Sequence, residues 1–192
     1  MAVKFETGNI TKATTDAIVN AANSGLQRGG GVCGSIFDAV KAAGGREAYD
    51  ELTAACNAIG HCSPGNAVIT PSFGLPATHI IHAVGPIWSG NSDPVDRLDV
   101  GQSAHIKTLA DTYRSIFRVC RENNLTSVTV PAISTGIYDF PEDLAAAIAV
   151  KVCMEESGDI AVTLIGFNSD NTIVLMNTPS PRAATLLSDL SF

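Results

Sequence analysis

Short apolar runs alternate along this chain with longer segments of helical pattern, and this alternation constrains the fold more than any other feature. Six runs have the length and nearly continuous apolar character of strands buried on both faces of a sheet. They are Val3 to Glu6, Ala17 to Ala21, Ala67 to Thr70, His79 to Val84, Ser127 to Val130 and Ile160 to Ile165. Because strands that alternate with helices build a sheet with helices on both faces, the sequence predicts the α/β class with about six strands.

The segments between these runs carry helix signals. Ser35 to Ala43 ends at Gly44-Gly45, and Glu47 to Ala58 ends at Gly60, since glycine commonly follows the last helical turn. Two further helices are expected from apolar spacing and from a proline start, at Ala104 to Asn123 and at Pro141 to Glu156. The predicted helices therefore fall between consecutive predicted strands, as expected of helices that cover a sheet.

Two segments are less regular. Gly85 to Gly101 contains Pro86 and Pro94 and reads as a long surface loop. The C-terminal segment, 169–192, remains open, because Asn171 to Met176 fits a helix or a strand and prolines precede the run from Ala183 to Leu190.

Length and charge limit the possible functions. The 192 residues, 45% of them hydrophobic, fit a single domain with one continuous core. The net charge of −7 and only 12 Lys and Arg residues argue against broad nucleic-acid binding. No apolar run is long enough to span a bilayer or to act as a signal peptide, so we expect a cytoplasmic monomer without a membrane contact.

The five cysteines form an odd, dispersed set without a C-x-x-C pair. They fit reduced thiols better than a disulfide framework. His61-Cys62 has no second closely spaced ligand pair, so we expect no metal site.

Two loops of small residues predict a site for a phosphate-bearing ligand. One contains Gly29-Gly30-Gly31-Val32, and the other, about a hundred residues later, is Ser134 to Tyr138. Glycine lets backbone N–H groups approach a ligand closely, and such groups at the start of a helix carry partial positive charge. Together the two loops can hold a diphosphate from both sides.

Five motifs in order carry a resemblance to a known family. They are Gly8 to Thr11, Asp16 to Asn23, Gly29 to Gly34, His82 to Pro86 and Ser134 to Tyr138. With these motifs the chain, from about Val3 to Phe167, resembles a macrodomain. The resemblance implies a three-layer α/β/α sandwich with a mixed, mostly parallel sheet. It also implies that ADP-ribose and mono-ADP-ribosylated proteins bind at the C-terminal ends of the strands, without a further cofactor, which agrees with the general rule for open α/β sheets.

The resemblance also implies roles for individual residues. Asn9 stands where the family usually has an aspartate that accepts a hydrogen bond from the adenine amino group. The Ile10 backbone contacts the same edge of the base. Asn23 lies by the distal ribose, Tyr138 closes over it, Phe167 stacks on adenine, and the two loops bind phosphate. Further ligand contacts are implied for Ala21, Gly30, Gly31, Val32, Cys33, Gly34, Ser134, Thr135, Gly136, Ile137 and Asn168.

Three of these interpretations have structural alternatives. Asn9 could simply start a turn, Phe167 could be a core residue, and Tyr138 could serve packing alone. Asn20, a polar residue in an apolar strand, is expected to tie down neighbouring backbone.

Cys33 stands where many hydrolytic macrodomains have an aspartate. A neutral thiol is a poor general base, so the catalytic residues implied are Asn23, which fixes the ribose, and Gly136, which crowds it, with Cys33 beside them. A water held between a ligand phosphate and loop backbone would then attack the anomeric carbon. Covalent catalysis by Cys33 is the alternative, but no histidine is expected to act as its base.

Three functions follow from this interpretation. The first is an enzyme that removes mono-ADP-ribose from acidic side chains or deacetylates O-acetyl-ADP-ribose. The second is a non-catalytic reader of ADP-ribose. The third, a binder of RNA or poly-ADP-ribose, has the acidic net charge against it.

Overall fold

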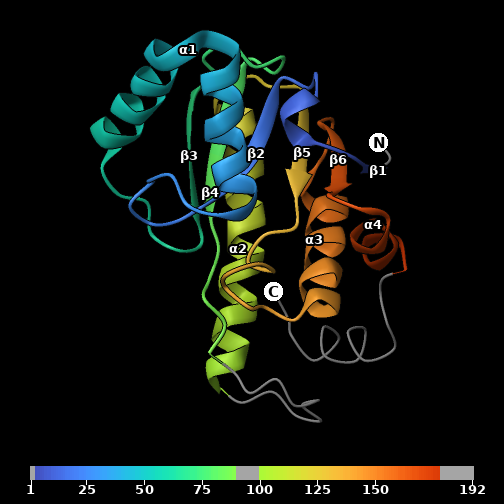
Figure 1. Ribbon diagram of the computed structural model, residues 1–192. Coiled ribbons are helices and arrows are strands. Elements are labelled where there is room, and N and C mark those ends of the chain that lie inside the picture. The colour runs from blue at the N-terminus through green and yellow to red at the C-terminus, as the bar shows by residue number, and fades with distance from the viewer. Residues whose placement is uncertain (1–2, 90–99, 178–192) are drawn as a thin grey trace.

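The computed structural model describes residues 3–89 and 100–177, and within them a single six-stranded sheet runs through the molecule (Figure 1). Its spatial order is β1-β6-β5-β2-β4-β3. The strands are β1 Lys4–Thr7, β2 Ala17–Ala22, β3 Asn66–Pro71, β4 His79–Val84, β5 Ser127–Pro131 and β6 Ala161–Gly166. All six predicted strands are confirmed to within about a residue.

Five of the strands are parallel, and β3 pairs antiparallel with β4 at one edge. The carboxyl ends of β1, β2, β4, β5 and β6 therefore open at the same edge of the sheet. The mixed, mostly parallel sheet is as predicted.

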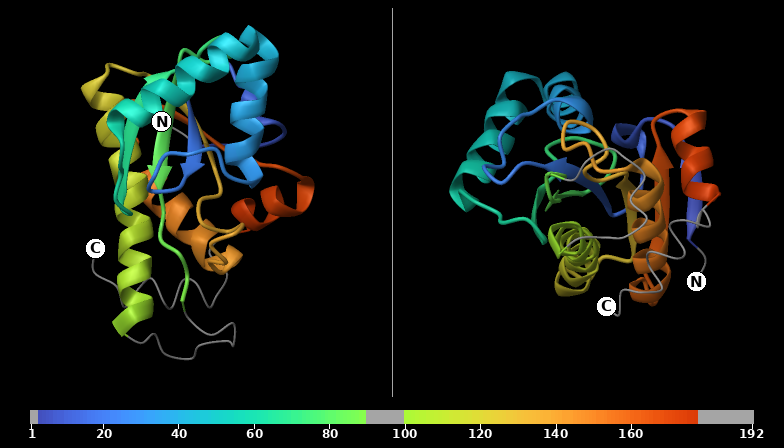
Figure 2. Two further views of the ribbon diagram at one scale, coloured as in Figure 1. Left: turned by 60° about the vertical axis from the view of Figure 1, so that its left-hand side comes forward. Right: turned by 90° about the horizontal axis from the view of Figure 1, so that it is seen from below.

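Helices cover both faces of the sheet (Figure 2). Alternate residues of each strand face opposite layers: Val19 packs toward α2 (Val100–Glu122) and α3 (Glu142–Glu156), whereas Ile18 packs toward α1 (Gly31–Ile59). This alternation follows from the two-residue period of a strand. The result is the expected three-layer sandwich.

Helix α1 is bent where two helices were predicted. Gly45 has φ 73° and ψ −164°, which breaks the helix between the segments predicted as Ser35 to Ala43 and Glu47 to Ala58. The first segment begins at Gly31 rather than Ser35, directly after the glycine loop. The helical alternative for Asn171 to Met176 is confirmed by α4 (Ser169–Met176), which packs against β1 and β6.

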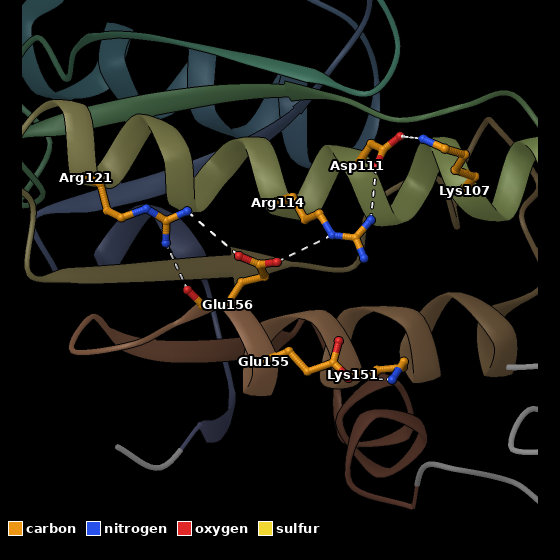
Figure 3. A network of polar contacts seen from close by, with 7 residues as sticks. All are labelled: Lys107, Asp111, Arg114, Arg121, Lys151, Glu155 and Glu156. Atoms are coloured by element: carbon orange, nitrogen blue, oxygen red, sulfur yellow. Dashed lines mark hydrogen bonds and ion pairs between the residues drawn. The ribbon is translucent and has the colours of Figure 1, made fainter. Parts of the chain in front are cut away.

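Ion pairs join α2 to the end of α3 on the surface (Figure 3). Glu156 meets Arg114 at 3.5 Å and Arg121 at 3.9 Å, and Arg121 also donates to the Glu156 carbonyl at 3.1 Å. Asp111 extends the network by pairing with Arg114 and Lys107. Such exposed pairs contribute little individually, but here they connect the helices that cover one face.

Outside the described residues lie most of the Gly85 to Gly101 loop and the run from Ala183 to Leu190. Within residues 3–89 and 100–177, no helix has the length and apolar character needed to cross a membrane.

Candidate functional site

A cavity of about 610 Å³ opens at the carboxyl ends of the five parallel strands. Segments that follow these strands form its wall: Gly8 to Ile10 after β1, Ala21 to Asn23 at the end of β2, Gly85 after β4, Pro131 to Tyr138 after β5 and Ile165 to Phe167 around the end of β6. The glycine loop and the first turn of α1 complete it, from Gly29 to Cys33 with Ser35. Segments far apart in the sequence thus converge on one hollow.

Every residue predicted to bind the ligand lies in this wall except Gly34 and Asn168. Gly34 packs beneath the glycine loop, where an added Cβ would lie 2.7 Å from the Gly29 carbonyl oxygen. Asn168 caps α4 instead, because its Oδ1 accepts from the Asn171 N–H at 2.9 Å. Both residues were predicted to bind the ligand, and the structure places them outside the wall.

Gly85 and Asn171 line the wall although the sequence analysis assigned neither of them a ligand contact. Asn171 reaches the wall only because the segment after β6 turns into a helix, which the sequence left undecided.

The first loop leads into the first turn of α1, whose leading N–H groups have no side-chain cap. Gly30 is the N-cap of α1, and it makes no side-chain capping bond. The first N–H groups of a helix have no intrahelical acceptor, so they are available to an anion in the cavity. Gly31 has φ 58°, a left-handed conformation that favours glycine.

The second loop lies against the first. A Cβ on Gly30 would be 3.0 Å from Cδ1 of Ile137, so the two loops meet at one side of the cavity. Ser134 has φ 67°, and its buried Oγ has no hydrogen-bond partner within the described structure. Strained backbone and an unpaired buried hydroxyl at a cavity wall are features of ligand sites rather than of ordinary turns.

Packing behind this second loop holds it in place. The Trp88 backbone N–H donates to the Tyr138 carbonyl at 2.8 Å, and the Ile133 backbone N–H donates to the Tyr113 hydroxyl at 3.3 Å. Partial burial raises the pKa of the Tyr138 phenol. The hydroxyl therefore stays protonated at neutral pH and can donate.

Asn23 folds its own loop into a closed turn. Its Nδ2 donates to the Gln27 carbonyl at 2.7 Å, and its Oδ1 accepts from the Gln27 N–H at 3.1 Å. An amide has two N–H groups and two oxygen lone pairs. One donor and one lone pair therefore remain for a ligand at the cavity wall.

Phe167, Asn9 and Ile10 form the end of the cavity beside β1 and β6. The Phe167 side chain is 82% exposed, which excludes the alternative of a core residue. Asn9 does start a turn, the short helix Ile10–Lys12, and it also lies in the cavity wall. Asn9 therefore starts a turn at a position that also lines the cavity, and its contact with the base stays a prediction.

A family model described as the Macro domain matches residues 19–149. This chain belongs to the macro domain family. A macro domain-containing protein of Lactiplantibacillus plantarum is 41% identical over 162 residues, 84% of each chain. A Klebsiella pneumoniae protein named O-acetyl-ADP-ribose deacetylase is 43% identical over 157 residues, 79% of each chain. Among solved structures, a mutant Oceanobacillus iheyensis macrodomain with ADPR matches with a TM-score of 0.74 and 31% identity, over 97% of this chain and 93% of that one.

Cys33 of this macrodomain joins three segments beneath the cavity. Its Sγ accepts from the Gly29 N–H at 3.4 Å and from Asn20 Nδ2 at 3.7 Å, and its thiol donates to the Gln27 carbonyl at 3.6 Å. The side chain is 4% exposed. Within the described residues no imidazole contacts this sulfur, so no direct base for a nucleophilic thiol is present.

Below Cys33 the macrodomain has a buried polar chain that the sequence did not reveal. Asn20 Nδ2 lies 3.1 Å from Nδ1 of His82, whose Nε2 lies 3.0 Å from Oγ1 of Thr70. Asn20 therefore contacts side chains rather than the neighbouring backbone, and that expectation is wrong. Burial lowers the pKa of His82 to about 4, so its ring is neutral at neutral pH.

Metal binding finds no support in the donor set. Among the described residues, no group of three or more His, Cys, Asp or Glu side chains is placed to hold a metal ion. The chemistry of the cavity is instead that of backbone N–H groups, amides and aromatic rings.

Proposed function

We propose that this macrodomain binds ADP-ribose in the cavity and hydrolyses ADP-ribosyl esters, either on acidic side chains of proteins or as O-acetyl-ADP-ribose. The observation that carries the proposal is the contact of the two loops at one side of the cavity, Gly30 against Ile137. This arrangement offers N–H groups to a diphosphate from two directions. The names of the Klebsiella and Oceanobacillus proteins support the same ligand class.

The residues of the cavity wall suggest where each part of such a ligand binds. The diphosphate belongs at the loops, because none of the described residues that line the cavity is a Lys or Arg and the backbone N–H groups must meet the negative charge. The base belongs at the exposed ring of Phe167, since base–aromatic stacking contributes about 1–3 kcal/mol. The distal ribose then lies between Asn23 and Gly136.

The proposed chemistry uses the ligand itself. A water held by a phosphate oxygen and loop N–H groups attacks the anomeric carbon of the distal ribose. The bond from that carbon to the carboxyl oxygen breaks, its electron pair leaves with the carboxylate, and the water proton passes to the phosphate oxygen. The protein contributes positioning and electrostatic stabilisation, so no strong base is needed from Cys33.

For O-acetyl-ADP-ribose the same water would attack the acetyl carbonyl carbon. The bond from that carbon to the ribose oxygen then breaks, the ribose oxygen takes a proton from the water and becomes a hydroxyl, and the acetyl group is released as acetate. Both reactions need the distal ribose and a phosphate-bound water in the same cavity, which is why we propose them for one site.

The test is release of ADP-ribose from a protein mono-ADP-ribosylated on glutamate or aspartate, with spontaneous ester loss subtracted. Catalytic release supports a hydrolase. Retention of the modified protein without release would instead support the reader, which the buried thiol at position 33 favours.

The variant for this test is Asn23→Ala, with Asn66→Ala as a control at the start of β3, outside the wall. We expect Asn23→Ala to lower the rate at least tenfold and Asn66→Ala to leave it unchanged. A parent rate in Asn23→Ala would remove the mechanism.

A further inference from the structure

Ile87 is an exposed hydrophobic residue that is held in place beside the second loop of the cavity. It is 61% exposed, although its neighbours Pro86 and Trp88 are buried. The Trp88 ring packs on Phe140 with ring centroids 4.7 Å apart, and the Trp88 backbone N–H donates to the Tyr138 carbonyl at 2.8 Å. The Ile87 side chain therefore projects to solvent from a backbone that is anchored on both sides.

The cavity itself does not account for this exposure. Ile137 and Phe167 are also exposed, but both line the cavity, where the proposed ligand would cover them. Ile87 lies outside the wall. It directly precedes Trp88, just as Ile137 directly precedes Tyr138, so the two isoleucines lie on segments that are hydrogen-bonded to each other. Single exposed isoleucines are common in soluble proteins, so it is this position at the edge of the cavity that calls for an explanation.

Asp139 gives the same edge of the cavity a negative charge. Its backbone N–H donates to the Gly136 carbonyl at 3.0 Å and its φ is 55°, so a tight turn fixes its position. The residue is exposed, and its carboxylate makes no ion pair within the described part of the chain. Glu142, in the first turn of α3, is a second exposed acidic residue nearby in the sequence. A partner that covers this edge should therefore bring cations rather than carboxylates.

A protein that carries ADP-ribose continues from the distal ribose, because its modified side chain is attached to the anomeric carbon. In the proposed function this ribose lies between Asn23 and Gly136. Residues one or two positions from the modified residue lie within roughly 7 Å of it along an extended chain. Ile87 and Asp139 border the wall segment from Gly136 to Tyr138, so these two side chains are the ones that such flanking residues would meet.

We propose that Ile87 and Asp139 form a docking surface for the modified protein, whose preferred segment has an apolar residue and a lysine or arginine beside the modified glutamate or aspartate. This inference rests on the proposed function. The apolar residue covers Ile87, and the cation pairs with the Asp139 carboxylate. O-acetyl-ADP-ribose has no such segment and gains nothing from this surface. The docking surface therefore favours ADP-ribosylated proteins over the small ester as the substrate class.

The probes are two peptides that carry ADP-ribose on a glutamine side chain, because the amide linkage resists hydrolysis and binding can then be measured by itself. Leucine and lysine flank the modified residue in the first peptide, and glycine and serine flank it in the second. In calorimetry on the full chain, we expect the first peptide to bind about tenfold more tightly than the second. Partial burial of one isoleucine together with one exposed ion pair can account for about this ratio.

Variants of the docking surface test where the ratio originates. Ile87→Ser should lower it to about threefold. Asp139→Asn should lower it as well and remove its dependence on salt, and asparagine tolerates the left-handed backbone of this position. Both variants should bind free ADP-ribose as the parent does, since neither residue lines the cavity.

Met154→Ser is the matched control for Ile87→Ser. Met154 is also 61% exposed, but it lies in the last turn of α3, roughly 18 Å along the helix from the end that follows the second loop. This variant should keep the tenfold ratio.

The outcomes separate this inference from the proposed function. Equal affinity of the two peptides for the parent protein, or an unchanged ratio in both Ile87→Ser and Asp139→Asn, would overturn the docking surface while free ADP-ribose still binds. If free ADP-ribose does not bind, the proposed function fails and the inference fails with it. The comparison of the two peptides on the parent protein needs no variant, so it decides the matter even if a variant does not fold.

Discussion

Asn20 donates its side-chain amide to Nδ1 of His82 across 3.1 Å, directly beneath the wall of the cavity. Because Nδ2 of Asn20 can only donate, Nδ1 is an acceptor and the ring proton lies on Nε2, facing Thr70 Oγ1 at 3.0 Å. The Thr70 hydroxyl in turn donates to the Pro71 carbonyl at 3.0 Å. This chain of contacts suits a neutral imidazole and leaves no acceptor for a second ring proton.

The neutral state of His82 predicts a loss of stability on acidification. Its pKa falls from 6.5 to about 4 on burial, so the unfolded chain binds more protons than the folded one between these two values. The free energy of unfolding should therefore drop as the pH falls through this window, by about 3 kcal/mol in total from His82. Urea unfolding at pH 7 and at pH 4.5 measures this slope.

The control for this prediction is a second histidine. His82→Gln should flatten the dependence on pH, whereas His61→Gln, at an exposed position, should keep it. An unchanged slope in His82→Gln would assign the acid sensitivity to other groups.

Gly85 is required by close packing against the second loop. An alanine Cβ there would lie 2.1 Å from Ser134 Oγ and 2.7 Å from Ile133 Cγ2. Gly85→Ala should therefore displace the loop, lower the free energy of unfolding by about 1–3 kcal/mol and weaken ADP-ribose binding. Denaturant unfolding and calorimetry measure the two effects, and a fully stable variant with parent affinity would contradict the packing argument.

Gly136 offers the opposite case on the same loop. A Cβ there meets no heavy atom of the protein within 4 Å, so Gly136→Ala should change the free energy of unfolding by less than about 0.5 kcal/mol. Because the position lines the cavity, the added methyl group should nevertheless lower ester hydrolysis at least tenfold. A destabilised Gly136→Ala protein would contradict the packing argument, and a stable one with the parent rate would place this glycine outside the ligand site.

Phe167 should contribute to binding and not to folding. Its ring is 82% exposed, so Phe167→Ala removes little buried surface and should leave the unfolding curve unchanged. Loss of base stacking should weaken ADP-ribose by roughly five- to a hundredfold, and Phe167→Tyr should retain affinity. Loss of stability without loss of affinity would show that the ring packs on protein instead.

The sequence predicted the fold well because strand length and apolar character are local properties. The break at Gly45 and the start of α3 after Pro141 were likewise readable from single residues. The antiparallel pairing of β3 was not, because pairing direction depends on which strand edge a segment meets. His82 was missed as a partner of Asn20 for the same reason: only the register of β2 with β4 brings these two positions opposite each other.

Within the site, the loops were predictable and the hydrogen-bond assignments were not. Glycine and small residues show in the sequence where backbone can approach a ligand. Whether the Asn9 side-chain oxygen is free depends on how the next two residues turn back, and in the structure it accepts from the Thr11 hydroxyl at 2.9 Å. Whether the hydrogen-bonding atoms of a side chain are already occupied depends on local geometry, and residue type alone does not determine that geometry.

Cys33 should act as a structural contact rather than as a nucleophile. Its sulfur accepts from Gly29 and Asn20 and donates to Gln27, at distances of 3.4 to 3.7 Å that are typical of weak sulfur hydrogen bonds. Cys33→Ala should cost about 1 kcal/mol of stability, because a small buried group and its contacts are lost. If the ligand phosphate positions the water, the same variant should lower ester hydrolysis by less than tenfold.

The rate of ADP-ribose release by Cys33→Ala, measured beside Asn23→Ala, decides between the two mechanisms. A covalent route through sulfur requires the thiol at every turnover, so its removal would reduce the rate by several orders of magnitude and abolish any labelled enzyme intermediate. The water route instead predicts that Asn23→Ala is the more damaging change, since in this route Asn23 positions the ribose while Cys33 only supports the loop that carries Gly29.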